Sequence, residues 1–237
     1  MAAAKDPVRI AISVGVYVML YVAAQFVLFF VLGIAGQVAS VILTVMLSAV
    51  FANWLALRIY ENRPLTAVGL WWNHASRNNL AFGLLGGIGS ACLVLAPPLL
   101  AGAAHLVRAP QAPAGGTLAF VTVMLAGGAV GEELLFRGYG FQVLLGSFGP
   151  YATIIPVGII FALLHGGNPN ATWFGLANTA GFGILFGYAF LRTRDLWLPI
   201  GIHFGWNLTL PLFGVQLSGL RMEITGHEMV WTAGKLW

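Results

Sequence analysis

The chain has 237 residues, of which 59% are hydrophobic and only 8% are charged, and it contains 31 glycines. This composition excludes an ordinary soluble domain and indicates an integral membrane protein. The formal net charge is +4, but the basic residues are scattered singly, so we expect no nucleic-acid partner. The single cysteine, Cys92, lies in an apolar segment, and no intrachain disulfide is possible.

Long continuous apolar segments predict membrane-spanning helices. A hydrocarbon core about 30 Å thick requires roughly 20 apolar residues per helical span. Continuous runs favour helices over the ten-residue alternation of a membrane barrel. We therefore expect an all-α fold, a polytopic transmembrane helical bundle of about seven spans. The expected spans are 10–33, 38–59, 79–101, 117–146, 150–166, 173–191 and 196–214.

Two connections divide the chain. The segment Arg63–Arg77 is too short and polar to span a bilayer, and its paired tryptophans are typical of a linker at the headgroup level. The proline-containing segment Gly102–Gly116 is expected to be a loop. Nearly all the unusual polar residues follow it. The predicted division is 1–116 for the N-terminal helices and linker, 117–214 for a core whose helices form a polar cavity, and 215–237 for a polar tail.

The distribution of basic residues predicts the orientation, because cytoplasmic loops are enriched in lysine and arginine. A cytoplasmic N-terminus places eight basic residues inside and three outside. We expect a multi-pass protein of the plasma (inner) membrane with this orientation. The inside set is Lys5, Arg9, Arg58, Arg63, Arg77, Arg137, Arg192 and Arg194, and the outside set is Arg108, Arg221 and Lys235.

Glycines recur at four-residue spacing in several spans, which lets helix backbones approach closely. Each pair alone is weak evidence of a helix contact. The pairs are Gly83 and Gly87, Gly127 and Gly131, Gly183 and Gly187, and Gly201 and Gly205.

Two adjacent carboxylates, Glu132 and Glu133, occur inside an apolar span. Ionisable residues at membrane depth are costly, and they commonly face a protein interior or a water-filled cavity. Helical neighbours point about 100° apart, whereas residues four apart share a face. Glu133 is therefore predicted to form a buried ion pair with Arg137, which leaves Glu132 to face a cavity. The alternative is that both glutamates only neutralise arginines or bridge helices.

Two histidines occur in later apolar spans, each with a partner four residues away on the same helical face. Phe161 precedes His165, and His203 precedes Asn207. A lone histidine in an apolar helix is more often a packing residue than a catalyst. Two of them beside a carboxylate pair favour a functional site, because buried polar groups need partners.

Helix lengths permit these groups to meet. If the spans 117–146 and 150–166 form a hairpin, Glu132 and His165 both lie roughly 21–23 Å from its turn. The hairpin therefore brings the two side chains to one level. His203, only seven residues into its own span, reaches that depth only if the spans are offset.

A carboxylate, two imidazoles and an amide can hydrolyse an acyl group. Glu132 with His165 could activate water as a general base, and His203 with Asn207 could stabilise the oxyanion. This route needs no cofactor. Alternatively, Glu132, His165 and His203 could hold one Zn²⁺. The chain has no His-Glu-x-x-His and no Gly-x-Ser-x-Gly motif.

At these residues the chain resembles the CAAX prenyl protease and bacteriocin-processing (CPBP, or Abi) family of intramembrane endopeptidases. The matching motifs are Glu-Glu-x-x-x-Arg, Phe-x-x-x-His and His-x-x-x-Asn, and the resemblance extends from about Thr117 to Phe213. All seven positions match in order, at Glu132, Glu133, Arg137, Phe161, His165, His203 and Asn207.

The resemblance implies an all-helical membrane fold and hydrolysis of a peptide bond, by a glutamate-dependent or a metal-dependent route. It assigns water activation to Glu132 and His165, the oxyanion hole to His203 and Asn207, and support to Glu133, Arg137 and Phe161. The implied partners are the bilayer and a peptide or protein substrate, which in this family can be lipidated. The alternatives are a non-catalytic scaffold or immunity protein of the same fold and a proton-coupled transporter.

Overall fold

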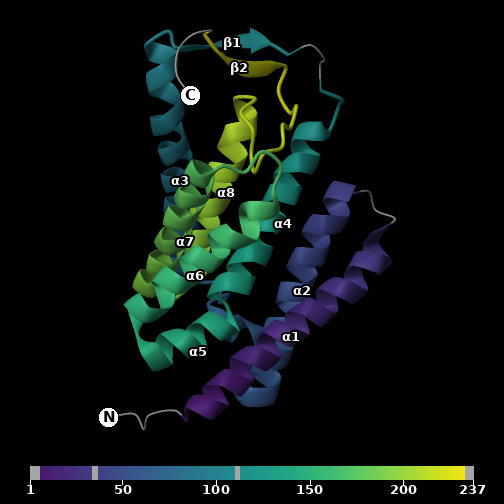
Figure 1. Cartoon of the computed structure of the whole chain (residues 1–237), viewed down its shortest axis with the longest axis vertical. Coiled ribbons are helices and arrows are strands. Elements are labelled where there is room, and N and C mark those ends of the chain that lie inside the picture. Colours follow the sequence, from purple (N-terminus) through teal and green to yellow (C-terminus); the bar gives the residue numbers. More distant parts are fainter. Residues whose placement is uncertain (1–5, 34–36, 110–112, 233–237) are drawn as a thin grey trace.

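The computed structural model describes residues 6–33, 37–109 and 113–232. Lys5 and Lys235, two of the basic residues on which the predicted membrane orientation rests, lie outside these ranges. The described residues form helices that stack side by side, with a small sheet at one end of the long axis (Figure 1). The α-helices are α1 (Pro7–Leu32), α2 (Gln37–Tyr60), α3 (His74–Leu100), α4 (Thr117–Arg137), α5 (Tyr139–Phe148), α6 (Pro150–Leu164), α7 (Trp173–Thr193) and α8 (Trp197–Leu212).

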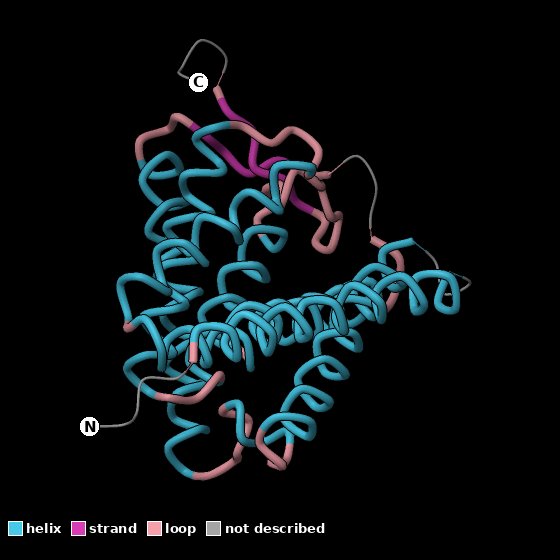
Figure 2. Tube along the Cα trace, turned by 60° about the horizontal axis from the view of Figure 1, so that its bottom comes forward, coloured by secondary structure: helices cyan, strands magenta, loops and turns pink. Residues whose placement is uncertain are grey.

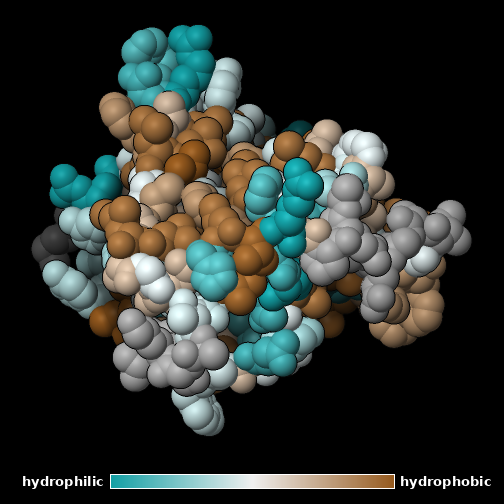
Figure 3. Space-filling model, turned by 90° about the horizontal axis from the view of Figure 1, so that it is seen from above, coloured by the Kyte–Doolittle hydropathy of each residue, from teal (hydrophilic) through white to brown (hydrophobic). Residues whose placement is uncertain are grey.

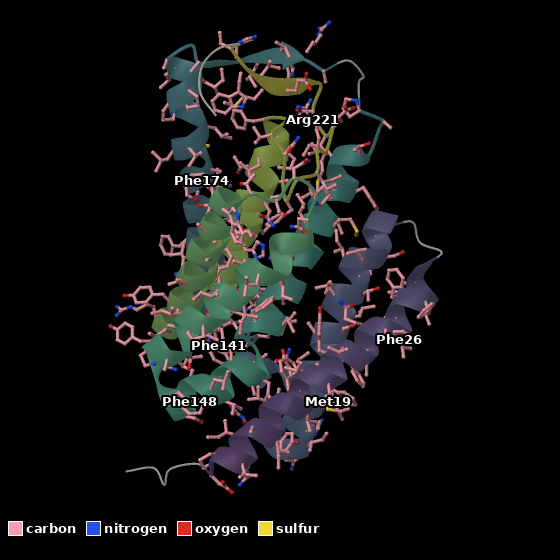
Figure 4. All side chains as sticks on the ribbon, in the orientation of Figure 1. Met19, Phe26, Phe141, Phe148, Phe174 and Arg221 are labelled. Carbon is pink, nitrogen blue, oxygen red and sulfur yellow. The ribbon has the colours of Figure 1, made fainter. Side chains whose placement is uncertain are left out.

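Six helical segments are long and apolar enough to cross a membrane, within the part of the chain that the structure describes. They correspond to the first six expected spans, and α8, which has 16 residues, occupies the seventh. Apolar side chains such as Met19 and Phe26 project from α1 and are 70% and 68% exposed (Figure 4). Because such residues on a helix are stable only against lipid or another apolar surface, the protein is an integral membrane protein with an all-helical, polytopic bundle.

Two short strands lie where a loop and a polar tail were expected. β1 (Ala104–Arg108) pairs antiparallel with β2 (His227–Trp231), with Ala104 opposite Trp231 (Figure 2). The segment 102–116 is therefore not entirely a loop. Alternation over five residues is a weak signal, and the pairing joins segments more than one hundred residues apart, so local sequence did not reveal it.

The predicted span 117–146 is broken in two. α4 ends at Arg137, and α5 begins at Tyr139 after Gly138. A side chain at Gly138 would collide with the side chain of Asn53 and with the carbonyl of Leu134, so the break depends on glycine.

The closest helix packing joins α3 to α8. A Cβ atom at Gly83 would lie 2.9 Å from the Cα of Gly201, and one at Gly205 would lie 2.6 Å from the carbonyl oxygen of Leu84. These distances confirm the predicted role of the glycine pairs in α3 and α8, since only glycine permits this backbone approach. α3 thereby fixes the position of α8, which carries His203.

The linker before α3 folds back on the connection between α7 and α8. η2 (Leu65–Val68) leads into Gly69, whose carbonyl accepts a hydrogen bond from the backbone N–H of Leu196 at 3.0 Å. The indole Nε1 of Trp197 donates to the carbonyl of Trp71 at 2.8 Å, and its ring contacts Trp72. These contacts place the tryptophan linker beside the start of α8, at the end of the bundle away from the strands.

Candidate functional site

Glu132 meets both histidines that the sequence singled out. Its Oε2 atom lies 3.7 Å from Nε2 of His165 and 3.8 Å from Nε2 of His203. The three side chains come from α4, the end of α6 and α8. Glu132 Oε2 is buried and has no hydrogen-bond partner among the described residues. A buried carboxylate oxygen without a partner is unusual, and two imidazole nitrogens just beyond hydrogen-bond distance leave it suited to bind a water molecule or a substrate group.

The predicted meeting of Glu132 and His165 is confirmed, although the path between them differs from a simple hairpin. The chain leaves α4 at Gly138, turns through α5 at the lower end of Figure 1, and returns along α6. The prediction that Glu132 and His165 lie at the same depth is therefore correct, but the two straight helices assumed for it are not, because α5 lies between α4 and α6. His165 itself begins η3 (His165–Gly167) immediately after α6, so its side chain lies near the C-terminal end of the span Pro150–Gly167.

The orientation of the His165 ring is fixed by Phe161, one helical turn earlier. Its Nδ1 atom is 2.7 Å from the carbonyl oxygen of Phe161, and the two rings contact each other with centroids 4.6 Å apart. A carbonyl only accepts, so Nδ1 carries a proton, and Nε2 is the ring nitrogen that faces Glu132. The i, i+4 spacing predicted a shared face, and the structure adds this hydrogen bond.

Glu133 forms the ion pair with Arg137 that the spacing predicts, and it also binds a histidine. Its Oε1 atom lies 3.2 Å from Nη1 of Arg137 and 2.9 Å from Nδ1 of His203. Both side chains of the ion pair are fully buried. Arg137 also donates from Nη2 to the carbonyl of Gly183 at 2.7 Å, which ties α4 to α7. The ion pair of Glu133 and Arg137 therefore holds α4, α7 and α8 together around the site.

Two phenylalanines pack around this charged group. Phe186 stacks on the imidazole of His203, with centroids 4.9 Å apart and planes inclined by 16°. The guanidinium of Arg137 lies 5.0 Å from the ring centroid of Phe161 and 5.2 Å from that of Phe186. Cation–π attraction and exclusion of water both favour this arrangement. Phe161 thus supports Arg137 as well as His165.

A buried polar cluster at the C-terminal end of α4 was not predicted from the sequence. The hydroxyl of Tyr17 donates to the carbonyls of Leu134 and Leu135, and Asn53 donates to Leu134 while accepting from the backbone N–H of Tyr139 at 2.7 Å. These contacts satisfy backbone groups that the end of α4 leaves without helical partners. They hold the turn of helix that carries both glutamates. A lone tyrosine and asparagine in apolar spans were the only sequence signal.

A cavity of about 290 Å³ opens beside Glu132. Asn207, one turn beyond His203, lines it together with the two histidines. Asn170, Asn178 and Thr179 also line it. The remaining lining residues are Phe161, Asn168, Pro169, Ala171, Thr172, Gly175, Leu176, Phe182, Phe186, Trp206, Leu210, Gln216, Leu217, Ser218 and Gly219.

The metal alternative does not fit this arrangement. Two imidazole nitrogens and a carboxylate oxygen are suitable ligand types for zinc. However, no three histidine, cysteine, aspartate or glutamate side chains in the described ranges are placed so that they could hold a metal ion. Glu132, His165 and His203 come together without forming such a set.

Comparison with known families agrees with this geometry. The sequence profile of the type II CAAX prenyl endopeptidase Rce1-like family matches residues 113–209. This segment belongs to the Rce1-like family. The Rce1-like segment contains α4 to α7 and most of α8, and therefore all seven motif residues. It supports a CAAX-type intramembrane protease fold. No curated protein and no solved structure matches the chain.

Proposed function

We propose that the protein is an intramembrane endopeptidase that hydrolyses a peptide bond of a membrane-associated peptide or protein. The observation that carries this proposal is the buried, unpartnered Oε2 of Glu132, which faces Nε2 of His165 and Nε2 of His203 at the edge of a cavity. A water molecule placed among these atoms would gain polar partners. The Rce1-like family of the surrounding segment supports the same reaction class.

In the proposed reaction, Glu132 removes a proton from that water while the Nε2 lone pair of His165 orients it. The water oxygen bonds to the carbonyl carbon of the substrate, and the carbonyl π electrons move to oxygen. When the C–N bond breaks, the protonated Glu132 returns its proton to the leaving amine. The sum is the addition of one water to one peptide bond, without a covalent enzyme intermediate.

His203 and Asn207 are proposed to stabilise the oxyanion. With Nδ1 directed at Glu133, His203 donates from Nε2 only when its ring carries both protons. Glu133 accepts from Nδ1 and fixes the ring, and Phe186 stacks on it and shields it from water. The amide of Asn207, one turn further along α8, supplies the second donor. Donors fixed in a water-poor site are the largest electrostatic contribution to acyl transfer.

Cleavage by purified protein tests the proposal. The protein is reconstituted in liposomes with a pool of membrane proteins, and newly formed peptide N-termini are identified by mass spectrometry. We expect a set of termini that appears with the native chain and is absent with His165→Ala. A His165→Ala variant that produces the same termini would contradict the proposal. If the native protein makes no new termini, and His165→Ala retains the biological activity of the native protein in cells, the scaffold alternative is correct.

A further inference from the structure

The cavity is lined by segments that lie at one end of the bundle. The loop 168–172 follows α6, and residues 216–219 follow α8. Asn170 donates to the carbonyl of Gly219 at 3.3 Å, so the two segments touch. Helices alternate in direction along the chain, which places both segments at the same end as β1 and β2 (Figure 1).

The arginines are concentrated at the opposite end. Figure 4 labels Arg221 at the end with the strands and Phe148 of α5 at the other. Apart from the buried Arg137, six arginines of the described residues lie in or beside the connections on the α5 side and two on the strand side. The first group is Arg9, Arg58, Arg63, Arg77, Arg192 and Arg194, and the second is Arg108 and Arg221. By the positive-inside rule, the α5 side is cytoplasmic.

Exposed aromatic side chains flank the cavity. Trp173 and Phe174, at the start of α7, directly follow the loop 168–172 and are 86% and 82% exposed. Aromatic residues at the ends of membrane helices favour the headgroup level. Seen from the strand end, hydrophilic and hydrophobic residues are mixed over the surface (Figure 3), as expected where a protein meets both water and lipid headgroups.

The lining chemistry limits what can enter. Apart from Glu132 and the two histidines, the polar groups of the cavity are neutral amides and hydroxyls, including those of Asn168, Thr172, Asn178 and Gln216. No lysine or arginine is among the lining residues. Amides and hydroxyls can hydrogen-bond the backbone of an extended peptide. The cavity therefore suits an extended peptide segment.

We propose that the catalytic cavity opens to the extracytoplasmic side of the membrane. Its substrate is then an extended segment of a protein at or beyond the outer bilayer surface. The identification of a substrate rests on the proposed function. The side on which the cavity opens depends on the fold and its orientation alone. A peptide presented at the cytoplasmic surface would meet the face with α5 and most arginines instead.

Thiol labelling tests the side of the opening without any need for activity. Cys92 is first replaced by alanine, and single cysteines are then introduced as Ala171→Cys at the cavity and Ala75→Cys at the α5 side. Both alanines are exposed, so the pair is matched. Sealed vesicles of right-side-out and inverted orientation receive a membrane-impermeant maleimide, and labelling in detergent defines the full extent.

We expect Ala171→Cys to label in right-side-out vesicles and Ala75→Cys only in inverted ones, with at least a tenfold preference in each case. The reverse pattern, or labelling of both from one side, would overturn the proposal. A second arm places one susceptible segment on either side of the membrane, and only the extracytoplasmic copy should be cut. If labelling is as expected but neither copy is cut, the proposed function fails while the orientation stands.

Discussion

Glu133 Oε1 lies 2.9 Å from Nδ1 of His203 and 3.2 Å from Nη1 of Arg137, so one buried carboxylate contacts both a cation and a proposed catalytic ring. The spacing within α4 predicted the arginine alone. Glu133 is thus a positioning residue for His203 as well as a structural partner. Glu132, its neighbour in sequence, faces the cavity. The two glutamates therefore have different roles.

Replacing Glu133 with glutamine should destabilise the protein strongly. The change leaves Arg137 buried without its anion, which costs about 3 kcal/mol or more in free energy of unfolding. The Arg137→Met change should cost a similar amount. The double variant should lose clearly less than the sum, because it leaves no unpaired buried charge. Chemical unfolding in detergent measures all three, and additive losses would show that the ion pair is not coupled.

The amide of Asn207 should act on turnover and not on substrate affinity. Asn207→Ala removes a proposed oxyanion donor, and kcat should fall by about 100-fold with little change in KM. Asn178→Ala removes a comparable amide from the same cavity at a position without that role, and it should mainly raise KM. Steady-state kinetics with a reporter peptide separate the two. Equal losses of kcat in both variants would remove Asn207 from the oxyanion hole.

Replacing Gly87 with alanine should disrupt the contact of α3 with α8, whereas the same change at the neighbouring Gly86 should not. A methyl group at Gly87 would collide with the backbone of Ile202, whereas the position of the Cβ at Gly86 is open. Gly87→Ala should lower the free energy of unfolding by about 2 kcal/mol. Gly86→Ala should be neutral or stabilising by up to about 1 kcal/mol, because alanine favours helix. Thermal unfolding of the pair measures the difference, and equal stability would contradict the packing.

Chelation should leave cleavage intact under the glutamate and histidine route. We expect unchanged rates in a strong chelator and far less than one equivalent of zinc in active protein. Elemental analysis of the purified sample provides the second readout. Activity that is lost on chelation and restored by zinc would instead assign Glu132, His165 and His203 as metal ligands.

Periodicity and spacing predicted the parts of this protein that depend on local sequence. Apolar runs located the helices, and the i, i+4 rule paired Glu133 with Arg137. Contacts that depend on how helices cross could not be read in this way. The bond between Glu133 and His203 joins α4 to α8, and the Tyr17 and Asn53 cluster joins α1 and α2 to the end of α4. The division into 1–116, 117–214 and 215–237 stays a prediction.

The central claim is that Glu132 activates the water that cleaves the substrate. The most direct test compares Glu132→Gln with Glu223→Gln, which makes the same change at an exposed position in the tail. The first should reduce the cleavage rate at least 100-fold with an unchanged unfolding temperature, since general-base catalysis contributes about 10²- to 10⁴-fold. The second should leave both unchanged. A folded Glu132→Gln variant that cleaves at the native rate would contradict the account.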